Sequence, residues 1–140
     1  MSLVRALTQN RAETDPHAPD FGLRGRTYAI SFDRVWTAAL LLANGGLPRL
    51  SVVSADDEAG IIRARGLTPI FRRVDDVRIT VSLDANGQTR VDIASVSLRR
   101  KRDLGSNARR IRRFLAALDA KLAATPAQIL DATRQPEFTA

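Results

Sequence analysis

The sequence predicts an α+β fold: a two-layer sandwich in which two main helices pack on one face of an antiparallel sheet of four to five strands. Two stretches carry this prediction. From residue 76 to 83, hydrophobic residues alternate with polar ones, which is the period of a half-buried strand. From residue 106 to 123 they recur every three or four positions, which is the period of an amphipathic helix. Short turns join the predicted strands, and strands joined in this way pair antiparallel.

Similar patterns place the other elements in chain order. We expect a strand over residues 26–30, and then a helix over residues 32–43 that Ser31 caps at its start. Further strand segments are expected at residues 50–55, 61–65 and 70–74. Pro69 places the last of these at a strand start or at the edge of the sheet, since proline cannot donate a ladder hydrogen bond.

The strand that returns over residues 88–98 follows an Asn-Gly turn, which is a strong signal for a tight hairpin. Its hydrophobic residues alternate as far as Ile93, but the next one, Val96, is out of phase by one position. A β-bulge near Ala94 and Ser95 would restore the alternation, so we expect one there.

The chain is expected to divide into three parts. Residues 1–24 contain two prolines and show no hydrophobic period, which predicts a flexible N-terminal segment. Residues 25–124 hold the α+β domain. Residues 125–140 open with Thr125-Pro126, a typical helix start, which predicts a short helix through residue 132 and then a tail.

The composition excludes several functional classes. The chain has no cysteine, which rules out disulfides, thiolate metal sites and cysteine nucleophiles. The single histidine, His17, lies in a proline-flanked polar stretch, which is a poor position for acid–base catalysis. Ser95 and Ser97 have no histidine nearby to activate either hydroxyl. The sequence therefore predicts no catalytic residue, no metal and no cofactor.

Four aspartates are candidates for an acid–base or metal cluster: Asp75, Asp76, Asp92 and Asp103. Asp76 and Asp92 lie on strands that are expected to pair, and each is two positions from an arginine on the same face, Arg78 or Arg90. Cross-strand ion pairing explains such an arrangement without any chemistry. A hydrolase-like enzyme that uses these aspartates is therefore the least favoured interpretation.

Residues 99–113 hold eight basic residues and one acidic residue, a net charge of +7. The whole chain also has a net charge of +7, so the remainder of the chain is balanced. Such a cluster favours an anionic membrane surface, an acidic protein or nucleic acid as a partner, although many proteins carry positive charge only for solubility.

A glycine turn at Gly105 precedes the predicted helix within this cluster. The free N–H groups at a helix start and the positive end of the helix dipole attract anions. We therefore hypothesise an anion-binding site formed by Arg99, Arg100, Lys101, Gly105, Ser106, Asn107, Arg109, Arg110 and Arg113. The alternative is that Ser106 or Asn107 simply caps the helix and that Asp103 pairs with Arg110.

Four stretches between Arg26 and about Leu122 resemble a bacterial and chloroplast family, the domain of unknown function numbered fourteen ninety-nine. They are YAISFDRVWTAAL, SVVSADDEAGIIRAR, DDVRITV with TRVDIASVS, and the motif Asp103-x-Gly105-x-Asn107-Ala108-x-Arg110-Ile111-x-x-Phe114-x-x-Leu118. The family-motif residues within them are Asp76, Asp92, Asp103, Gly105, Asn107 and Arg110. The resemblance implies the fold given above and usually an envelope or membrane-associated setting, and it implies no activity.

The N-terminus does not have the pattern of a signal peptide, because it holds too few apolar residues and Arg5 interrupts them. No stretch approaches the ~20 apolar residues of a membrane span. We therefore expect a soluble, cytoplasmic protein from the sequence as written, with a peripheral membrane or envelope setting implied by the resemblance.

Our main hypothesis is a non-enzymatic binding or scaffold domain whose basic surface engages an anionic lipid surface or an acidic protein partner. The alternative is a nucleic-acid-binding protein. Such a protein needs exposed aromatic rings for base stacking, and Tyr28 and Phe71 are the two that the predicted core leaves over.

Overall fold

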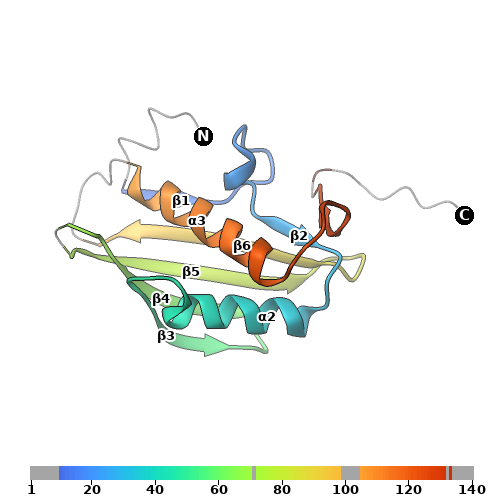
Figure 1. The fold of residues 1–140 in the computed structure, drawn as a ribbon, viewed down its shortest axis with the longest axis horizontal. Coiled ribbons are helices and arrows are strands. Elements are labelled where there is room, and N and C mark those ends of the chain that lie inside the picture. Colours follow the sequence, from blue (N-terminus) through green and yellow to red (C-terminus); the bar gives the residue numbers. More distant parts are fainter. Residues whose placement is uncertain (1–9, 71, 99–104, 132, 134–140) are drawn as a thin grey trace, which may run out of the picture.

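The computed structural model describes residues 10–70, 72–98, 105–131 and 133. It is an α+β fold in which two long helices lie side by side on one face of an antiparallel sheet (Figure 1). The helices are α2 (Phe32–Leu41) and α3 (Ser106–Lys121), and short helical turns occur at η1 (Phe21–Leu23), η2 (Leu42–Gly46) and η3 (Pro126–Gln128). The strands are β1 (Arg11–Glu13), β2 (Arg26–Tyr28), β3 (Leu50–Asp56), β4 (Ile61–Leu67), β5 (Val74–Leu83), β6 (Thr89–Ser97) and β7 (Ile129–Leu130).

The sheet is larger than the four to five strands that the sequence predicts. Its strand order is β3-β4-β5-β6-β2-β7, and β1 pairs with β6 as well, so seven strands occur in the described part of the chain. The predicted fold class is therefore confirmed, and the two additional strands, β1 and β7, are short segments near the two ends of the chain. Strands of two or three residues are too short to show a hydrophobic period.

The N-terminal part of the described chain belongs to the sheet. Strand β1 pairs antiparallel with residues 94–96 of β6. Ala12, Ala18 and Leu23 are all buried within the hydrophobic core. For residues 10–24, this arrangement differs from the flexible segment that the sequence predicts, and residues 1–9 lie outside the described residues.

The predicted β-bulge near Ala94 and Ser95 is wrong. Strands β5 and β6 pair without interruption from Asp75 opposite Ser97 to Leu83 opposite Thr89. The residues of β6 that face the helices therefore continue in strict alternation, and the serines at 95 and 97 take the inward positions that hydrophobic residues occupy earlier in the strand. The inner face of the sheet becomes polar at this end, which is why the hydrophobic pattern changes phase.

Two other predicted elements differ in the structure. No separate strand occurs in the described residues between 70 and 73, because Ile70 lies in a turn and β5 begins only at Val74. The helix predicted after Pro126 is a single turn, and the chain then extends as β7, which pairs with the free edge of β2.

The core lies between the sheet and the two long helices. Val77, Ile79 and Val81 alternate on the inner face of β5, and they are almost completely buried. Helix α3 covers this face with Ile111, Phe114, Leu115 and Leu118, which recur at three- and four-residue spacing as predicted. Among the described residues, no helix has the length and apolarity needed to cross a membrane.

Candidate anion-binding site

A buried polar cluster connects the start of α3 to the sheet. The side chain of Asn107 is completely buried, and its Oδ1 accepts a hydrogen bond of 2.7 Å from the Ser95 hydroxyl. Its Nδ2 donates to the Ser97 hydroxyl at 3.0 Å and to the backbone carbonyl of Asn10 at 2.9 Å. The amide of Asn107 is therefore used inside the domain, where it joins α3, β6 and the residue before β1.

Gly105 occupies the N-cap position of α3, so the alternative in which Ser106 or Asn107 caps the helix is wrong. Gly105 has φ 82° and ψ 5°, a left-handed conformation that glycine adopts without steric penalty. Gly105 has no side chain with which to cap the helix, and the Asn107 amide is bound to the hydroxyls of Ser95 and Ser97.

Arg110 is the cationic member of the polar cluster. Its Nη1 donates to Asp75 Oδ2 at 2.6 Å, to the Ser95 hydroxyl at 3.1 Å and to Asn107 Oδ1 at 3.3 Å. Asp75 is completely buried, so this ion pair lies at the interface between α3 and the sheet. A buried guanidinium can be tolerated here because the carboxylate and two further oxygens accept its hydrogens.

Gly66 on β4 makes room for the Arg110 guanidinium. A Cβ atom at position 66 would lie 2.6 Å from Cζ and 2.7 Å from Nε of Arg110. Only the absence of a side chain allows the planar group to lie against the strand at this point. Gly66 is therefore a positioning residue for Arg110, although the two are 44 positions apart in the sequence.

Beside this cluster lies a cavity of about 110 Å³ that we call the arginine pocket. Its charged lining consists of Arg49, Arg109, Arg110 and Arg113, and Ser106 at the first turn of α3 also contributes. Within the part of the chain that the structure describes, no carboxylate lines it, and the remaining lining residues are apolar apart from Thr68. The pocket combines guanidinium groups with the N-terminal end of a 16-residue helix, an arrangement that attracts anions.

The basic residues around α3 differ in how far acidic partners neutralise them. Arg110 pairs with Asp75, and Arg112 donates to Asp20 at 2.6 Å on the surface. That hydrogen bond lowers the pKa of the Asp20 carboxyl, and the opposing effect of partial burial is smaller. Arg113 and Arg49 are exposed and have no ion pair among the described residues.

Two of the three family-motif aspartates, Asp76 and Asp92, lie away from the arginine pocket. Asp76 lies on the outer face of β5, opposite Arg65 of β4, and its neighbour Asp75 takes the inward position. Asp92 lies on the outer face of β6, where it accepts hydrogen bonds from Thr14 and Arg90.

Asp76 and Asp92 are not neighbours. The register places Val96 opposite Asp76 and Thr80 opposite Asp92, so the two carboxylates are four positions apart along the strands. Asp92 does form an ion pair with Arg90, with Nη2 of Arg90 at 2.8 Å from Oδ1, but within β6 and not across two strands as expected. No group of three potential metal-ligating residues occurs in the described ranges.

Four of the predicted residues cannot be placed, and two residues that the sequence analysis did not single out belong to the site. Arg99, Arg100, Lys101 and Asp103 lie outside the described residues. Arg49 and Gly66 were missed, because only the strand pairing of β3 and β4 brings them to α3. The available signal for the polar cluster was the strict alternation of β6, which places both serines on the helix side.

One comparison with known proteins gives a match. A family model described as "Protein of unknown function (DUF1499)" matches residues 5–118, and the chain belongs to this family. No curated protein and no solved structure matches the chain.

Proposed function

We propose that this member of the family is a non-enzymatic binding domain that docks on an anionic lipid surface through the arginine pocket. The observation that carries the proposal is the convergence of Arg49, from the turn before β3, with Arg109 and Arg113 of α3 around a cavity that is lined by no carboxylate of the described residues. Guanidinium groups are suited to phosphate headgroups because they present several donors in a fixed plane.

The turn that carries Arg49 is held in place. Arg49 has a positive φ of 60°, which is unfavourable for a side chain of this kind. Its carbonyl accepts a hydrogen bond of 2.9 Å from the backbone N–H of Leu67, which ties the turn to β4. A strained backbone that the surrounding structure maintains is typical of binding sites, and here it directs an arginine to the pocket.

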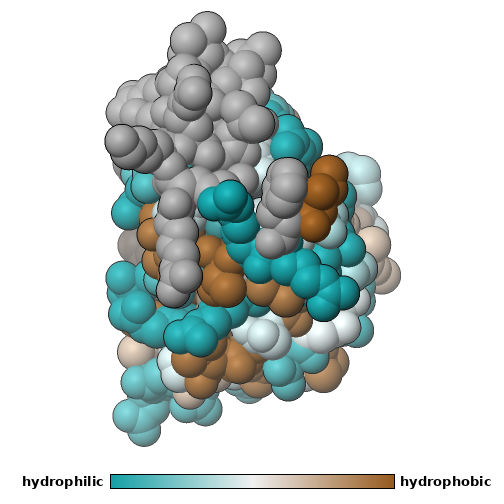
Figure 2. All heavy atoms as spheres, turned by 90° about the vertical axis from the view of Figure 1, so that its left-hand side faces the viewer, coloured by the Kyte–Doolittle hydropathy of each residue, from teal (hydrophilic) through white to brown (hydrophobic). Residues whose placement is uncertain are grey.

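Exposed hydrophobic residues at the same end favour a lipid surface over an acidic protein. Residues 67–69 line the pocket and lead directly to Ile70, which is 82 % exposed. Val74 and Leu98 are also exposed, and they are neighbours because the N–H of Leu98 donates to the Val74 carbonyl at 3.4 Å. Figure 2, which faces this end, shows hydrophobic and hydrophilic residues side by side. A bilayer surface offers both apolar and anionic contacts.

The electrostatic contribution is modest. An arginine near an anionic bilayer surface contributes about 1 kcal/mol, so the three exposed arginines of the pocket together contribute roughly 3 kcal/mol. We therefore expect weak, reversible and salt-dependent binding from the described residues.

Nucleic-acid binding is less well supported. Tyr28 is completely buried and donates a hydrogen bond of 2.5 Å to Asp119, so its ring is not available for base stacking. Phe71 lies outside the described residues. Phe21 is 54 % exposed, but it lies near the other end of α3 and not at the arginine pocket.

Vesicle flotation tests the proposal directly. The protein is mixed with phosphatidylcholine vesicles that contain or lack phosphatidylglycerol, with duplex DNA, and with polyglutamate, at low and at high salt. We expect flotation only with phosphatidylglycerol, its loss at high salt, and a reduction by Ile70→Ser. Equal binding to both vesicle types would contradict the proposal. Preferential binding to DNA or to polyglutamate would do so as well, and would identify the alternative partner.

A further inference from the structure

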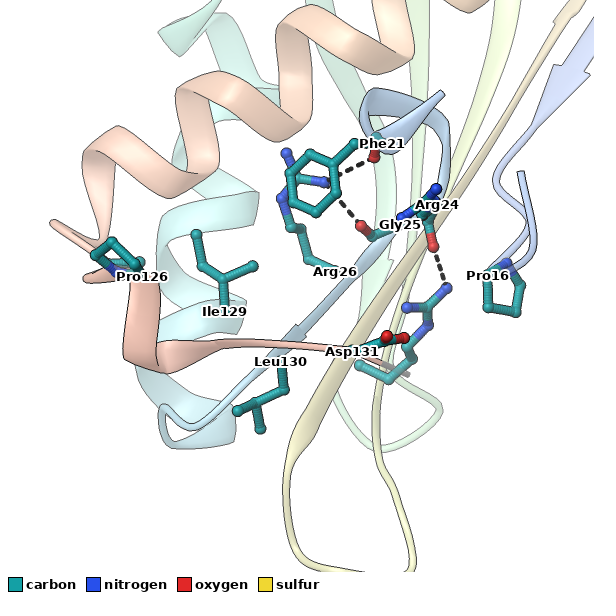
Figure 3. Close-up of a pocket in the computed structure, with 11 residues that line it drawn as sticks. Pro16, Phe21, Arg24, Gly25, Arg26, Pro126, Ile129, Leu130 and Asp131 are labelled. Carbon is teal, nitrogen blue, oxygen red and sulfur yellow. Dashed lines mark hydrogen bonds between the residues drawn. The ribbon is translucent and has the colours of Figure 1, made fainter. Parts of the chain in front are cut away.

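A second cavity, of about 390 Å³, lies near the C-terminal end of α3. It is formed by η1, the residues around the start of β2, and the chain that follows α3 through η3 and β7 (Figure 3). Its volume falls in the range of about 300–1,000 Å³ that is usual for small-molecule sites. It shares no lining residue with the arginine pocket.

One wall of this cavity is apolar. It consists of Pro16, Phe21, Ala124, Pro126, Ile129 and Leu130. Phe21 is a large aromatic residue that is 54 % exposed, and its ring lies 4.5 Å from the guanidinium carbon of Arg26. In Figure 3 the ring of Phe21 covers this guanidinium. Exposed apolar surface around a concave site favours a ligand with an apolar body.

The polar groups of the cavity are mainly cationic. Arg24, Arg26 and Arg90 contribute guanidinium groups, whereas Asp131 is the one carboxylate among the lining residues. Oδ1 of Asp131 accepts hydrogen bonds from the backbone N–H and the hydroxyl of Thr133. Arg26 is paired with Asp119 and Arg90 with Asp92, whereas Arg24 forms no ion pair among the described residues. Arg24 is therefore the cation that is available to an anionic ligand.

Arg26 is fixed in a defined orientation and supports the wall of the cavity. Its Nε is 3.0 and 3.1 Å from the two carboxylate oxygens of Asp119, and its Nη1 donates to the carbonyls of Gly25 and Phe21. Arg26 is only 5 % exposed, and its charge is neutralised by Asp119. Its guanidinium therefore holds the ring of Phe21 in place and is not the group that meets an anionic ligand.

We propose that this cavity binds a small organic anion with an apolar body, such as an aromatic or short aliphatic carboxylate. The body would lie against Phe21, Ile129 and Leu130. The carboxylate would accept hydrogen bonds from Arg24, whose Nη1 makes no hydrogen bond among the described residues.

The cavity is separate from the arginine pocket, to which the lipid-docking proposal applies. Part of its wall also lies outside the region that the family model matches. The family model ends at residue 118, whereas the wall formed by Ala124, Pro126 and β7 follows that position. Ligand binding here therefore depends on how the segment after α3 closes against β2.

An NMR titration of the full-length protein with 1-naphthoate tests the proposal, and 1-naphthalenemethanol serves as the uncharged control ligand. We expect the backbone amide signals of Gly25, Ile129 and Leu130 to shift, and the anion to bind about tenfold more tightly than the alcohol. Arg24→Gln and Phe21→Ala should each weaken naphthoate binding by about tenfold, since they remove a charge and an apolar wall. Both side chains are exposed, so the fold should persist.

Two further variants locate the effect. Arg63→Gln, an exposed arginine on β4, and Arg113→Glu in the arginine pocket should leave naphthoate affinity unchanged. The proposal is overturned if both Arg24→Gln and Phe21→Ala bind naphthoate as the unmodified protein does. It is also overturned if the alcohol binds equally well, or if the shifts cluster at the start of α3. Loss of naphthoate binding in Arg113→Glu would place the site in the arginine pocket instead.

Discussion

The two ends of α3 are fixed to the sheet by ion pairs of opposite polarity. At the N-terminal end, the helix contributes Arg110 and the sheet contributes Asp75. At the C-terminal end, the helix contributes Asp119 and the sheet contributes Arg26. Each order is the reverse of what the helix dipole favours, since anions stabilise the start of a helix and cations its end. The charges are therefore explained by their partners on the sheet and not by helix stability.

The two ends of α3 differ in the charged residues that line the cavity beside each ion pair. Arg26 faces a carboxylate that also accepts the Tyr28 hydroxyl, and the adjoining cavity is largely apolar. At the other end, Arg110 is neutralised, and no carboxylate of the described residues lines the adjoining pocket, to which Arg49, Arg109 and Arg113 contribute. Similar pairs thus fix both ends of the helix, while the cavities beside them differ: the N-terminal one is lined by several arginines, and the C-terminal one is largely apolar with Arg24 as its available cation.

The largest expected effect comes from removing the completely buried carboxylate. Asp75→Asn removes a carboxylate that is completely buried and leaves the Arg110 guanidinium without its counter-charge, so the free energy of unfolding should fall by about 3–5 kcal/mol. Asp119→Asn should cost less, about 2 kcal/mol, because the Asp119 side chain is 23 % exposed and water can enter at its position, whereas the position of Asp75 is closed to water. Urea denaturation of both variants measures the two values. The reverse ranking would contradict the comparison.

Gly66→Ala should lower the free energy of unfolding by about 1–3 kcal/mol, because the new Cβ displaces the Arg110 guanidinium from its partners. The matched experiment repeats the substitution in an Arg110→Ala background, where the obstructing group is gone. The penalty should then largely disappear in urea denaturation. An unchanged penalty in that background would show that Gly66 serves the backbone of β4 and not Arg110.

The C-terminal end predicts an alkaline limit to stability. Burial, and then the hydrogen bond to Asp119, raise the pKa of Tyr28 above its ordinary value of 10.0. The folded state therefore keeps the proton that the unfolded state loses. The stabilisation is fully present below pH 10 and declines above it, by up to about 1.4 kcal/mol per pH unit.

This prediction has a direct spectroscopic readout, because Tyr28 is the only tyrosine in the chain. Tyrosinate absorbance should appear together with unfolding and not before it. In Tyr28→Phe, the free energy of unfolding should lose this dependence on pH above 10. Ionisation of the tyrosine near its ordinary pKa in a fully folded protein would contradict the burial and hydrogen bonding described for this end.

The smallest expected effect belongs to the surface pair of Arg112 and Asp20. Both side chains are more than one-third exposed, so Asp20→Asn should change the free energy of unfolding at neutral pH by less than about 1 kcal/mol. Because the folded protein lowers the pKa of Asp20, the contribution is present above the ordinary pKa of 3.8 and is lost as the pH falls below it. Urea denaturation at neutral pH and at a pH below 3.8 measures this contribution. The free energies of unfolding of the variant and the unmodified protein should differ only at neutral pH.

Long, periodic segments could be predicted from the sequence, and contacts between distant segments could not. The spacing of Ile111, Leu115 and Leu118 was sufficient to place α3 and its buried face. The pairing of strands β5 and β6 followed from the Asn-Gly turn and from the alternation of β5. Strands β1 and β7 exist because β6 and β2 offer free edges, and no local pattern in two or three residues reports such an edge.

The candidate site shows the same division at the level of single residues. Gly105, Asn107 and Arg110 were singled out from one contiguous stretch. Their roles differ from the expectation of a ligand site. Asn107 and Arg110 form hydrogen bonds with Ser95 of β6 and Asp75 of β5, so these groups hold the domain together. An interruption of the hydrophobic pattern in β6 was interpreted as a bulge, whereas it marks the place where the core becomes polar.

Matched charge reversal is the most direct test of the claim that the N-terminal end of α3 keeps an available cationic surface. Arg49→Glu/Arg113→Glu reverses two arginines of the pocket, and Arg63→Glu/Arg78→Glu reverses two exposed arginines that face each other across β4 and β5. Both variants change the net charge of the protein equally. We expect the first to lose flotation with phosphatidylglycerol vesicles and the second to retain it. Equal loss in the two variants would show that overall charge, and not the arginine pocket, attracts the membrane.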